Sequence, residues 1–379
     1  MRLKDYKIDV WILLAVLFLL IFSLGAVYSS SSTFSMDKFN DPDYMFKQHL
    51  IKVAISIFCI FLFARFNYKA YMDWGKYLIW ISIGMLAFIF VGGVSEIKGA
   101  SRWISLGPLS FQPSDVAKFT LIIYVSTLLV RKKDYVQMLY RGYLPILFYI
   151  LLVTILVALQ PNFSTASLIF ITSILILLNS PVKLKHIFYT ITALIPFAVI
   201  FVLSKSYIMG RLSSHAEYTS GGNSNYQLQQ AMIGFGNGGI FGIGPGNSLQ
   251  KEYFLPEAHG DFIFSVVGEE YGFIGTFIVV ALFAVIMIRG YKIAKDMTED
   301  FGRYVAFGIT TIISLYAIVN MCVSTGLIPT TGVPMPFISY GGTAMIINSI
   351  AIGVLLNISS FRNEPADTEW TPFLEESIR

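Results

Sequence analysis

Charged residues are scarce in this 379-residue sequence: Asp, Glu, Lys and Arg make up 13% of it, whereas hydrophobic residues make up 55%. Soluble domains contain about a quarter charged residues, so the composition argues against an ordinary water-soluble protein and indicates a chain solvated mainly by lipid. The net charge of +4 is modest and gives no reason to expect a nucleic-acid partner. The positions of the basic residues are more informative than their number.

Cysteine is almost absent. The two cysteines, Cys59 and Cys322, each lie within an apolar segment. Buried cysteines of this kind usually pack as small hydrophobic residues, so we expect neither a disulfide nor a cysteine metal site.

The sequence is instead rich in long apolar runs. Several approach the roughly 20 residues that a membrane-spanning helix needs. Backbone groups cannot remain unpaired in lipid, and these runs are too long and too uniformly apolar for the alternating strands of a barrel. We therefore predict an all-α integral membrane protein with about ten transmembrane helices. The predicted spans are residues 9–29, 48–66, 75–93, 114–130, 143–159, 163–180, 186–204, 262–288, 304–325 and 339–358.

The first span is predicted to be retained in the mature protein. Its apolar run, residues 10–24, continues into residues 25–28 without the small-residue cleavage site of a signal peptide. We expect residues 1–360 to form one polytopic membrane domain and residues 361–379 to form a cytoplasmic tail.

Lysine and arginine are divided unevenly between the two sides of these spans. If the N-terminus is cytoplasmic, most basic residues fall in cytoplasmic loops and tails, and the positive-inside rule then places both termini in the cytoplasm. The basic residues left on the outer side are Lys38, Lys47, Lys52, Lys98, Arg102, Lys118, Lys205, Arg211 and Lys251.

One long segment, residues 205–261, interrupts the pattern of short connections and is expected to be an extracellular loop between the seventh and eighth spans. Loops of this length are usually functional or disordered. Its glycine-rich part also contains apolar residues, which favours a position partly in the membrane interface. Residues 234–239 match the pattern G-x-G-x-x-G but follow no strand, so a flexible backbone is favoured over dinucleotide binding.

The entrance to the fourth span is polar. Pro113 and Ser114 fit the start of a helix, and Asp115 suits its positive end. Lys118 follows one turn later, where a cation costs about 2.5–3.5 kcal/mol on insertion scales, so it should face a cavity and a partner. It either pairs structurally with Asp115 or binds a ligand.

Arg102 and Trp103 precede this entrance. Trp103 fits a residue of the aromatic belt at the membrane interface. Alternatively, the two residues bind a lipid headgroup, with the arginine on a phosphate and the tryptophan stacked on a sugar.

Two other stretches have the composition of turns near span ends. In residues 160–165, Asn162 or Ser164 can cap the sixth span. Residues 326–343 form a Pro/Gly-rich hairpin that reads as a rigid wall around a cleft, with Ser339 or Thr343 as a cap or a ligand donor.

The stretch LPEAHGDFIFSVVGEE, residues 255–270, places a cluster of carboxylates at the mouth of a hydrophobic span, in a chain that mostly avoids charge. Asp261 stands immediately before the eighth span, where it is either a helix cap or a catalytic base. Glu257 and His259 alternate with it, which is a weak metal signal. Two further acids, at positions 269 and 270, lie inside the span, and at least one must meet a donor within the helix bundle.

Five blocks of sequence together resemble the SEDS family of membrane enzymes, the FtsW, RodA and SpoVE proteins. The resemblance extends over nearly the whole chain, to Ser360, and its short motifs favour the division branch, FtsW, over the elongation branch. The blocks are GASRWISLGP at 99–108, FQPSDVAK at 111–118, GNSLQK at 246–251, LPEAHGDFIF at 255–264 and PMPFISYGGT at 334–343.

The resemblance implies a peptidoglycan glycosyltransferase in a bacterial cytoplasmic membrane, with its active site facing outward. Its substrate would be lipid II, a disaccharide-pentapeptide on a polyprenyl diphosphate. Asp261 corresponds to the family's catalytic aspartate and would act as general base. The residues expected to bind substrate are Arg102, Trp103, Gln112, Ser114, Lys118, Arg211, Lys251, Glu257, His259 and Ser339.

The resemblance also implies partners: a class B penicillin-binding protein that crosslinks the new strands, and other proteins of a division or elongation complex. A divalent cation, Mg²⁺ or Mn²⁺, could help to hold the diphosphate, although no ligand set is readable from the sequence. The chain departs from the family pattern at Asn162 and Ser164, which replace Asp and Gly, and at Gly260, which replaces Thr.

Two other functions remain open at this level. A lipid II flippase or other transporter would use Lys118, Glu269 and Glu270 to line a path through the membrane. A non-catalytic scaffold for a division complex would need the Asp261 cluster only for structure. The spans show no obvious inverted repeat, and the polar residues collect on one side, both of which favour the enzyme.

Overall fold

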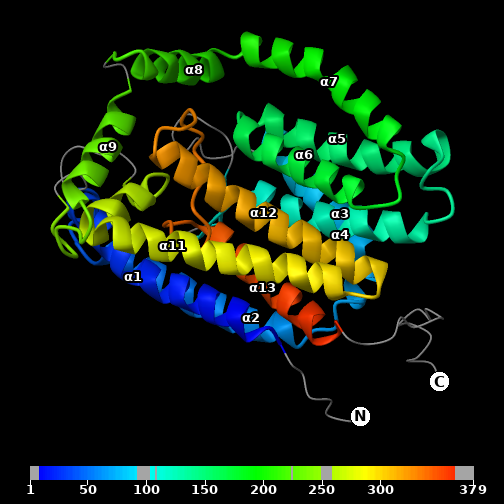
Figure 1. The fold of residues 1–379 in the computed structure, drawn as a ribbon, viewed down its shortest axis with the longest axis horizontal. Coiled ribbons are helices and arrows are strands. Elements are labelled where there is room, and N and C mark those ends of the chain that lie inside the picture. Colours follow the sequence, from blue (N-terminus) through cyan, green and yellow to red (C-terminus); the bar gives the residue numbers. More distant parts are fainter. Residues whose placement is uncertain (1–7, 92–102, 107–108, 223–224, 249–257, 363–379) are drawn as a thin grey trace.

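The structure, a computed structural model, describes residues 8–91, 103–106, 109–222, 225–248 and 258–362 as a bundle of long helices (Figure 1). The helices are α1 (Val10–Phe39), α2 (Tyr44–Ala64), α3 (Ala70–Val91), α4 (Pro113–Arg131), η1 (Leu139–Tyr143), α5 (Leu144–Leu159), α6 (Phe163–Leu178), α7 (Leu184–Ser204), α8 (Ser206–Thr219), α9 (Tyr226–Gly238), α11 (Ile263–Asp296), α12 (Asp300–Ser324) and α13 (Thr343–Ser360). Two short antiparallel strands, β1 (Ile104–Leu106) and β2 (Leu109–Phe111), precede α4.

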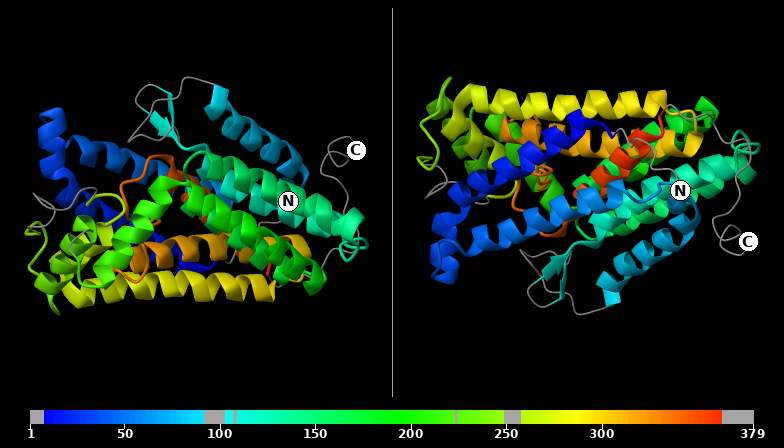
Figure 2. Two further views of the ribbon diagram at one scale, coloured as in Figure 1. Left: turned by 90° about the horizontal axis from the view of Figure 1, so that it is seen from above. Right: turned by 90° about the horizontal axis from the view of Figure 1, so that it is seen from below.

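The prediction of an all-α membrane protein is confirmed. Nine helices of the described chain are long and apolar enough to cross a membrane, and α6 is a tenth apolar helix of only 16 residues. The small β1–β2 hairpin was not predicted (Figure 2). The segment 205–261, expected as a loop, is largely helical in its described part because it contains α8 and α9.

The helices differ greatly in how much of their surface is covered. Nearly every residue of α4 is buried among α3, α5, α12 and α13. By contrast, α7 buries only His186 and Ile187 and lies over one side of the bundle in Figure 1, while large apolar residues cover its exposed surface. An exposed apolar surface of this extent is typical of a helix bathed in lipid.

The first helix is longer than predicted, because the serine-rich stretch after residue 28 does not end it. The hydroxyl of Ser31 donates to the carbonyl of Val27 at 2.7 Å, so this serine bonds within the helix. The hydroxyl of Ser29 donates to the buried carboxylate of Glu270 on α11. Serines can therefore line this part of α1 without exposing polar groups to lipid.

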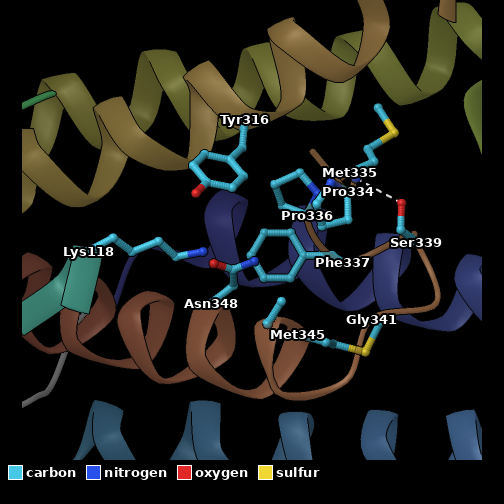
Figure 3. Close-up of a pocket in the computed structure, with 11 residues that line it drawn as sticks. Lys118, Tyr316, Pro334, Met335, Pro336, Phe337, Ser339, Gly341, Met345 and Asn348 are labelled. Carbon is cyan, nitrogen blue, oxygen red and sulfur yellow. Dashed lines mark hydrogen bonds between the residues drawn. The ribbon is translucent and has the colours of Figure 1, made fainter. Parts of the chain in front are cut away.

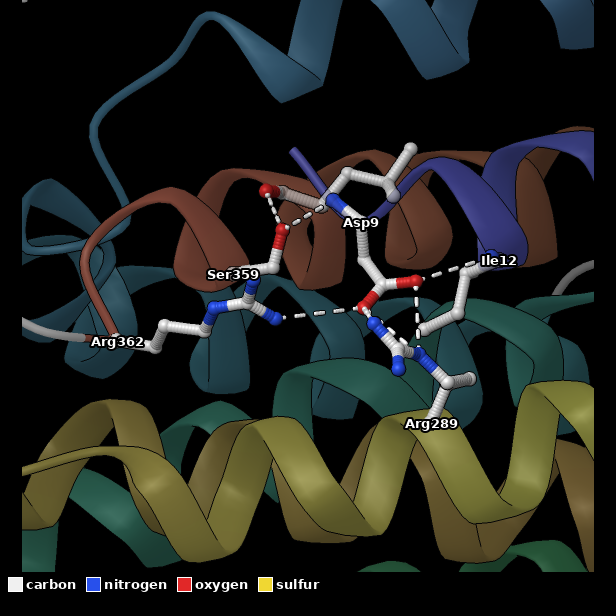
Figure 4. A network of polar contacts seen from close by, with 6 residues as sticks. Asp9, Ile12, Arg289, Ser359 and Arg362 are labelled. Atoms are coloured by element: carbon white, nitrogen blue, oxygen red, sulfur yellow. Dashed lines mark hydrogen bonds and ion pairs between the residues drawn. The ribbon is translucent and has the colours of Figure 1, made fainter. Parts of the chain in front are cut away.

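The two termini of the described chain meet at one end of the bundle (Figure 4). The carboxylate of Asp9 is buried and accepts from Arg289 Nε at 3.0 Å, and Arg362 Nη1 lies 3.5 Å from it. The backbone N–H of Asp9 donates to the hydroxyl of Ser359 at 2.9 Å. This network joins α1, α11 and α13. We call the opposite end of the bundle, where α1 ends and α2 begins, the distal end.

Near the distal end α11 is broken. Gly272 has φ 64° and ψ −160°, which separates a short helix that begins at Ile263 from the long helix that follows. The segment Gly239–Gly244, which follows α9, lies against this break. The segment and the broken region of α11 form hydrogen bonds with each other in place of those that an unbroken helix would make within itself.

Two N–H groups after the break donate to the segment, and two N–H groups of the segment donate to carbonyls before the break. These bonds are Phe273 N to Gly239 O at 2.9 Å, Ile274 N to Ile240 O at 3.2 Å, Ile243 N to Glu269 O at 3.0 Å and Gly244 N to Glu270 O at 3.0 Å. Unpaired backbone groups are very costly in lipid, so the glycine segment is what permits the break. Gly239, the last glycine of the G-x-G-x-x-G pattern, thus has a structural role.

The side chains of the two acids before the break also have donors, as predicted. Glu269 accepts hydrogen bonds from Ser248 and, at 3.4 Å, from the amide of Asn237. Glu270 accepts from Ser29. Both carboxylates are almost completely buried, and they link α9, Ser248 and α1 to the helix before the break.

The first prediction concerns Gly242, whose φ is 82°. A Cβ at this position would stand 2.2 Å from the carbonyl oxygen of Glu270. We expect Gly242→Ala to lower the free energy of unfolding by at least about 2 kcal/mol, because it adds backbone strain to a steric clash. The melting temperature of the detergent-solubilised protein, measured by fluorescence-detected size exclusion, should fall clearly.

Gly84→Ala is the matched control. A Cβ on Gly84, within α3, would meet nothing within 4 Å. Alanine should raise helix stability there by about 0.5–1 kcal/mol. Equal melting temperatures for the two variants would contradict the role assigned to the glycine segment.

Candidate active site

Asp261 lies at the distal end, two residues before α11. The residue in the N-cap position of α11 is Phe262, so Asp261 stands one residue before the cap. The carbonyl oxygen of Asp261 accepts from the side-chain amide of Asn320 at 2.9 Å. Its side chain is half-buried and lines a cavity of about 460 Å³.

Arg211 of α8 reaches the same cavity. Its Nη1 donates to the carbonyl of Thr331 at 3.1 Å. The point where a Cβ would stand on Gly332 is 3.6 Å from Asp261 Oδ2 and 3.7 Å from Arg211 Nη2. Gly332 is therefore close to both a carboxylate and a guanidinium, and its lack of a side chain leaves open the space beside them.

Two cavities meet at this point. The cavity beside Asp261 also has polar lining residues on α8 and α9, including Ser214, Asn225 and Gln227. A second cavity of about 260 Å³ is mostly apolar and lies among α6, α8, α12 and residues 328–331. Residues common to both are Tyr207, Arg211 and Thr330. The site is thus a polar chamber next to an apolar groove, with Arg211 at their junction.

The hairpin between α12 and α13 fixes the backbone before α11. The hydroxyl of Ser339 donates to the carbonyl of Gly260 at 2.7 Å and accepts from the N–H of Met335 at 2.8 Å. The N–H of Tyr340 donates to the carbonyl of His259 at 2.8 Å. Ser339, predicted as a cap or a ligand donor, is buried and uses its hydroxyl to position this backbone.

Lys118 occupies a different place from Asp261 and Arg211 (Figure 3). It is buried, forms an ion pair with Asp115 at 3.0 Å, and lies 4.4 Å from the ring centroid of Tyr316. The cavity beside it measures about 10 Å³, room for one water molecule at most, and is closed by the hairpin and α13. No lining residue of this cavity also lines the chamber beside Asp261.

The other predicted site residues are dispersed. His259 is half-buried, with its ring between Phe34 at 5.2 Å and Tyr340 at 5.8 Å, centroid to centroid. The N–H of Gln112 donates to the hydroxyl of Thr343 at 3.2 Å. Ser114 is buried in the first turn of α4, and Trp103 is half-buried just before β1.

Three predicted site residues, Arg102, Lys251 and Glu257, lie outside the described residues. Within the described part of the chain, no group of three His, Cys, Asp or Glu side chains could hold a metal ion. Because Glu257 lies outside that part, the pattern Glu257-x-His259-x-Asp261 is not covered by this observation.

Sequence reasoning missed Asn320, which is almost completely buried in α12. Its amide donates to the carbonyl of Asp261 and, at 2.9 Å, to the carbonyl of Val333. It therefore ties the start of α11 to the hairpin. The signal was present in the sequence, since a lone asparagine within an apolar span must find polar partners. Gly332 gave no such signal.

Comparison with known proteins identifies the family of this chain. The family model of the FtsW, RodA and SpoVE cell cycle proteins matches residues 10–364. A probable peptidoglycan glycosyltransferase FtsW of Trichlorobacter lovleyi is 35% identical over 361 residues, which cover 95% of this chain and 94% of the relative. The stage V sporulation protein E of Bacillus subtilis is 33% identical over 364 residues, covering 95% of this chain and 99% of the relative.

Two solved structures have the same fold. A chain of a peptidoglycan synthase complex, studied for the coordination of polymerization and crosslinking, superposes with a TM-score of 0.77 at 22% identity, covering 95% of this chain and 99% of that one. The rod shape determining protein RodA of Thermus thermophilus superposes with a TM-score of 0.68 at 21% identity, covering 96% of this chain and 100% of that one. The chain is a multi-pass membrane protein that belongs to the FtsW/RodA/SpoVE family of cell cycle proteins.

Proposed function

We propose that this protein is a peptidoglycan glycosyltransferase that polymerises lipid II during cell division or elongation. The observation on which the proposal rests is the meeting of Asp261 and Arg211 beside Gly332, in a polar chamber next to an apolar groove. A substrate with a saccharide, a diphosphate and a polyprenyl chain needs all three of these environments at one place. Relatives similar over almost the whole chain bear the name of this activity.

The reaction joins the 4-hydroxyl oxygen of one lipid-linked sugar to the anomeric carbon of another. The bond from that carbon to the diphosphate breaks, and the hydroxyl proton must go to a base. Asp261 is the carboxylate that faces the chamber, and it takes the proton. Arg211, which is also close to Gly332, stabilises the negative charge that develops on the departing diphosphate.

The apolar groove suits the first isoprene units of the prenyl chain. Phe163, Leu168 and Ile208 line it, and it adjoins Arg211. A diphosphate held by that arginine would therefore have its lipid chain directed into apolar surroundings. Ser164, one of the departures from the family pattern, also lines this groove.

The orientation proposed for the protein places both termini in the cytoplasm and the distal end outside a bacterial cytoplasmic membrane. The end that holds the Asp9 network is also rich in arginine. Arg289 and Arg362 pair with Asp9, and Arg303 pairs with Asp300 at the start of α12. Arginine and lysine collect on the cytoplasmic side of membrane proteins. Asp261 would then work where lipid II is exposed on the outer surface.

We also propose a class B penicillin-binding protein as partner, which would crosslink the glycan strands as they form. The support is the similarity in fold to a chain of a peptidoglycan synthase complex that joins polymerization to crosslinking. The flippase alternative is less well supported, because the charges that would line its path are already paired. Lys118 is bound to Asp115, and Glu269 and Glu270 accept hydrogen bonds from serines.

The second prediction tests the base. With purified protein and lipid II in proteoliposomes, Asp261→Asn should lower the rate of glycan polymerisation by roughly 10²-fold or more, because the amide cannot accept the proton. Asp37→Asn is the control: this acid is exposed near the end of α1 and should be dispensable. Polymer formed at the normal rate by Asp261→Asn would overturn the assignment, as would translocation of lipid II without any polymer from the unmodified protein.

The third prediction concerns Asn320 as a positioning residue. Asn320→Leu keeps the volume but leaves the carbonyls of Asp261 and Val333 without their donor. We expect kcat to fall by about 10²-fold, the size of effect produced by a displacement of about 1 Å at a reacting group, with little change in KM. Ile318→Ala, an exposed change on the same helix, should alter neither constant. A lower melting temperature with unchanged kcat would mean that Asn320 contributes only to stability.

A further inference from the structure

Lys52 is a cation in an unusual position. It is the ninth residue of α2, about two turns from the distal end, and is half-buried. A lysine inside a span normally has a partner, because the charge is costly there. Lys47 of the same helix pairs with Asp41 at 2.9 Å, and Lys118 pairs with Asp115. Within the described chain, Lys52 has neither a carboxylate partner nor a hydrogen bond.

The contact that Lys52 does make leads to the active site. Its ammonium lies 4.2 Å from the ring centroid of Tyr340, a cation–π arrangement. The ring of Tyr340 is also 5.8 Å from the rings of His259 and His49. Since the N–H of Tyr340 donates to the carbonyl of His259, only one residue, Gly260, separates this bonded pair from Asp261.

The hairpin between α12 and α13 therefore has a cation at each of its flanks. Arg211 donates to Thr331 near the start of the hairpin, and Lys52 lies over Tyr340 near its end. Asp261 is tied to the same hairpin, because Asn320 joins its carbonyl to that of Val333. Arg211 lines the chamber beside Asp261, whereas Lys52 contacts Tyr340 and lines neither of the two cavities next to Arg211.

We propose that Lys52, supported by the ring of Tyr340, is a second anion site that binds the diphosphate of the acceptor saccharide lipid. This inference rests on the proposed function, in which two diphosphate-linked saccharides must be bound at once. The diphosphate that departs is attached directly to the reacting carbon, so it belongs at Arg211, close to the base. The acceptor reacts through the far sugar of its disaccharide, so its own diphosphate lies a disaccharide length from the base.

The fourth prediction uses three variants of α2. Lys52→Met has similar length without the charge, Lys52→Arg retains the charge, and Lys47→Met removes an exposed lysine of the same helix. The probe is farnesyl diphosphate, titrated into protein in phosphatidylcholine nanodiscs. The unmodified protein, Lys47→Met and Lys52→Arg should bind two equivalents, and Lys52→Met should bind one. The equivalent that remains in Lys52→Met should be lost on adding Arg211→Met.

Kinetics provide the second readout. Lys52→Met should raise KM for lipid II by roughly tenfold or more, because a charge-assisted contact to a phosphate is lost, while kcat changes much less. Lys52→Arg should restore KM. Two bound equivalents in Lys52→Met, or an unchanged KM, would show that Lys52 only packs on Tyr340 and would overturn the proposal.

Two further experiments distinguish failure of the proposed Lys52 site from failure of the proposed function. Phosphatidylglycerol shares the phosphate chemistry, and equal competition by this lipid at the Lys52 site would overturn the assignment to a diphosphate lipid. If the unmodified protein makes no polymer from lipid II, the proposed function fails. The titration with farnesyl diphosphate still reports the second site in that case, because it requires no turnover.

Discussion

Every backbone amide and carbonyl within a membrane-spanning bundle must find its partner in the protein, because lipid offers none. Around α11, the described chain departs from regular helix before Ile263 and at Gly272, and at both places hydrogen bonds from elsewhere in the chain supply the missing partners. At Gly272, the segment Gly239–Gly244 replaces the bonds that α11 loses. Before α11, the hairpin and Asn320 bind the carbonyls of residues 259–261. The candidate active site lies between these two places.

This requirement also explains what several polar side chains do. Ser339 was predicted as a cap or a ligand donor and Asn320 was missed, yet the side chains of both donate to backbone carbonyls. Their contribution to function would therefore be to hold Asp261 in place. A base attached to an irregular stretch of backbone can be positioned accurately only if that stretch has no freedom of its own, and these bonds remove it.

Much of the fold could be predicted from the sequence, because apolar runs and the lipid environment leave helices as the only solution. The pairing of Asp115 with Lys118 was also predictable, as one of two alternatives, from their spacing on one helix. The approach of Arg211 to Asp261 was not, since it depends on how α8 lies across the hairpin. Residues 234–239 were interpreted as flexible backbone. The exchange of bonds between the glycine segment and α11 joins residues about 30 positions apart, and no local pattern encodes such a pairing.

Lys118, Arg211 and Lys52 differ in how many partners the protein provides for their positive charges. Lys118 has a carboxylate, a ring and almost no space, so its charge is already compensated inside the bundle. Arg211 gives one nitrogen to a backbone carbonyl and keeps another beside an open chamber. Lys52 has an aromatic ring alone among the described residues. An anionic ligand offsets the cost of a buried cation most where the protein itself provides the fewest partners for that cation. Binding of a ligand at this site is therefore expected to depend more on Arg211 and Lys52 than on Lys118.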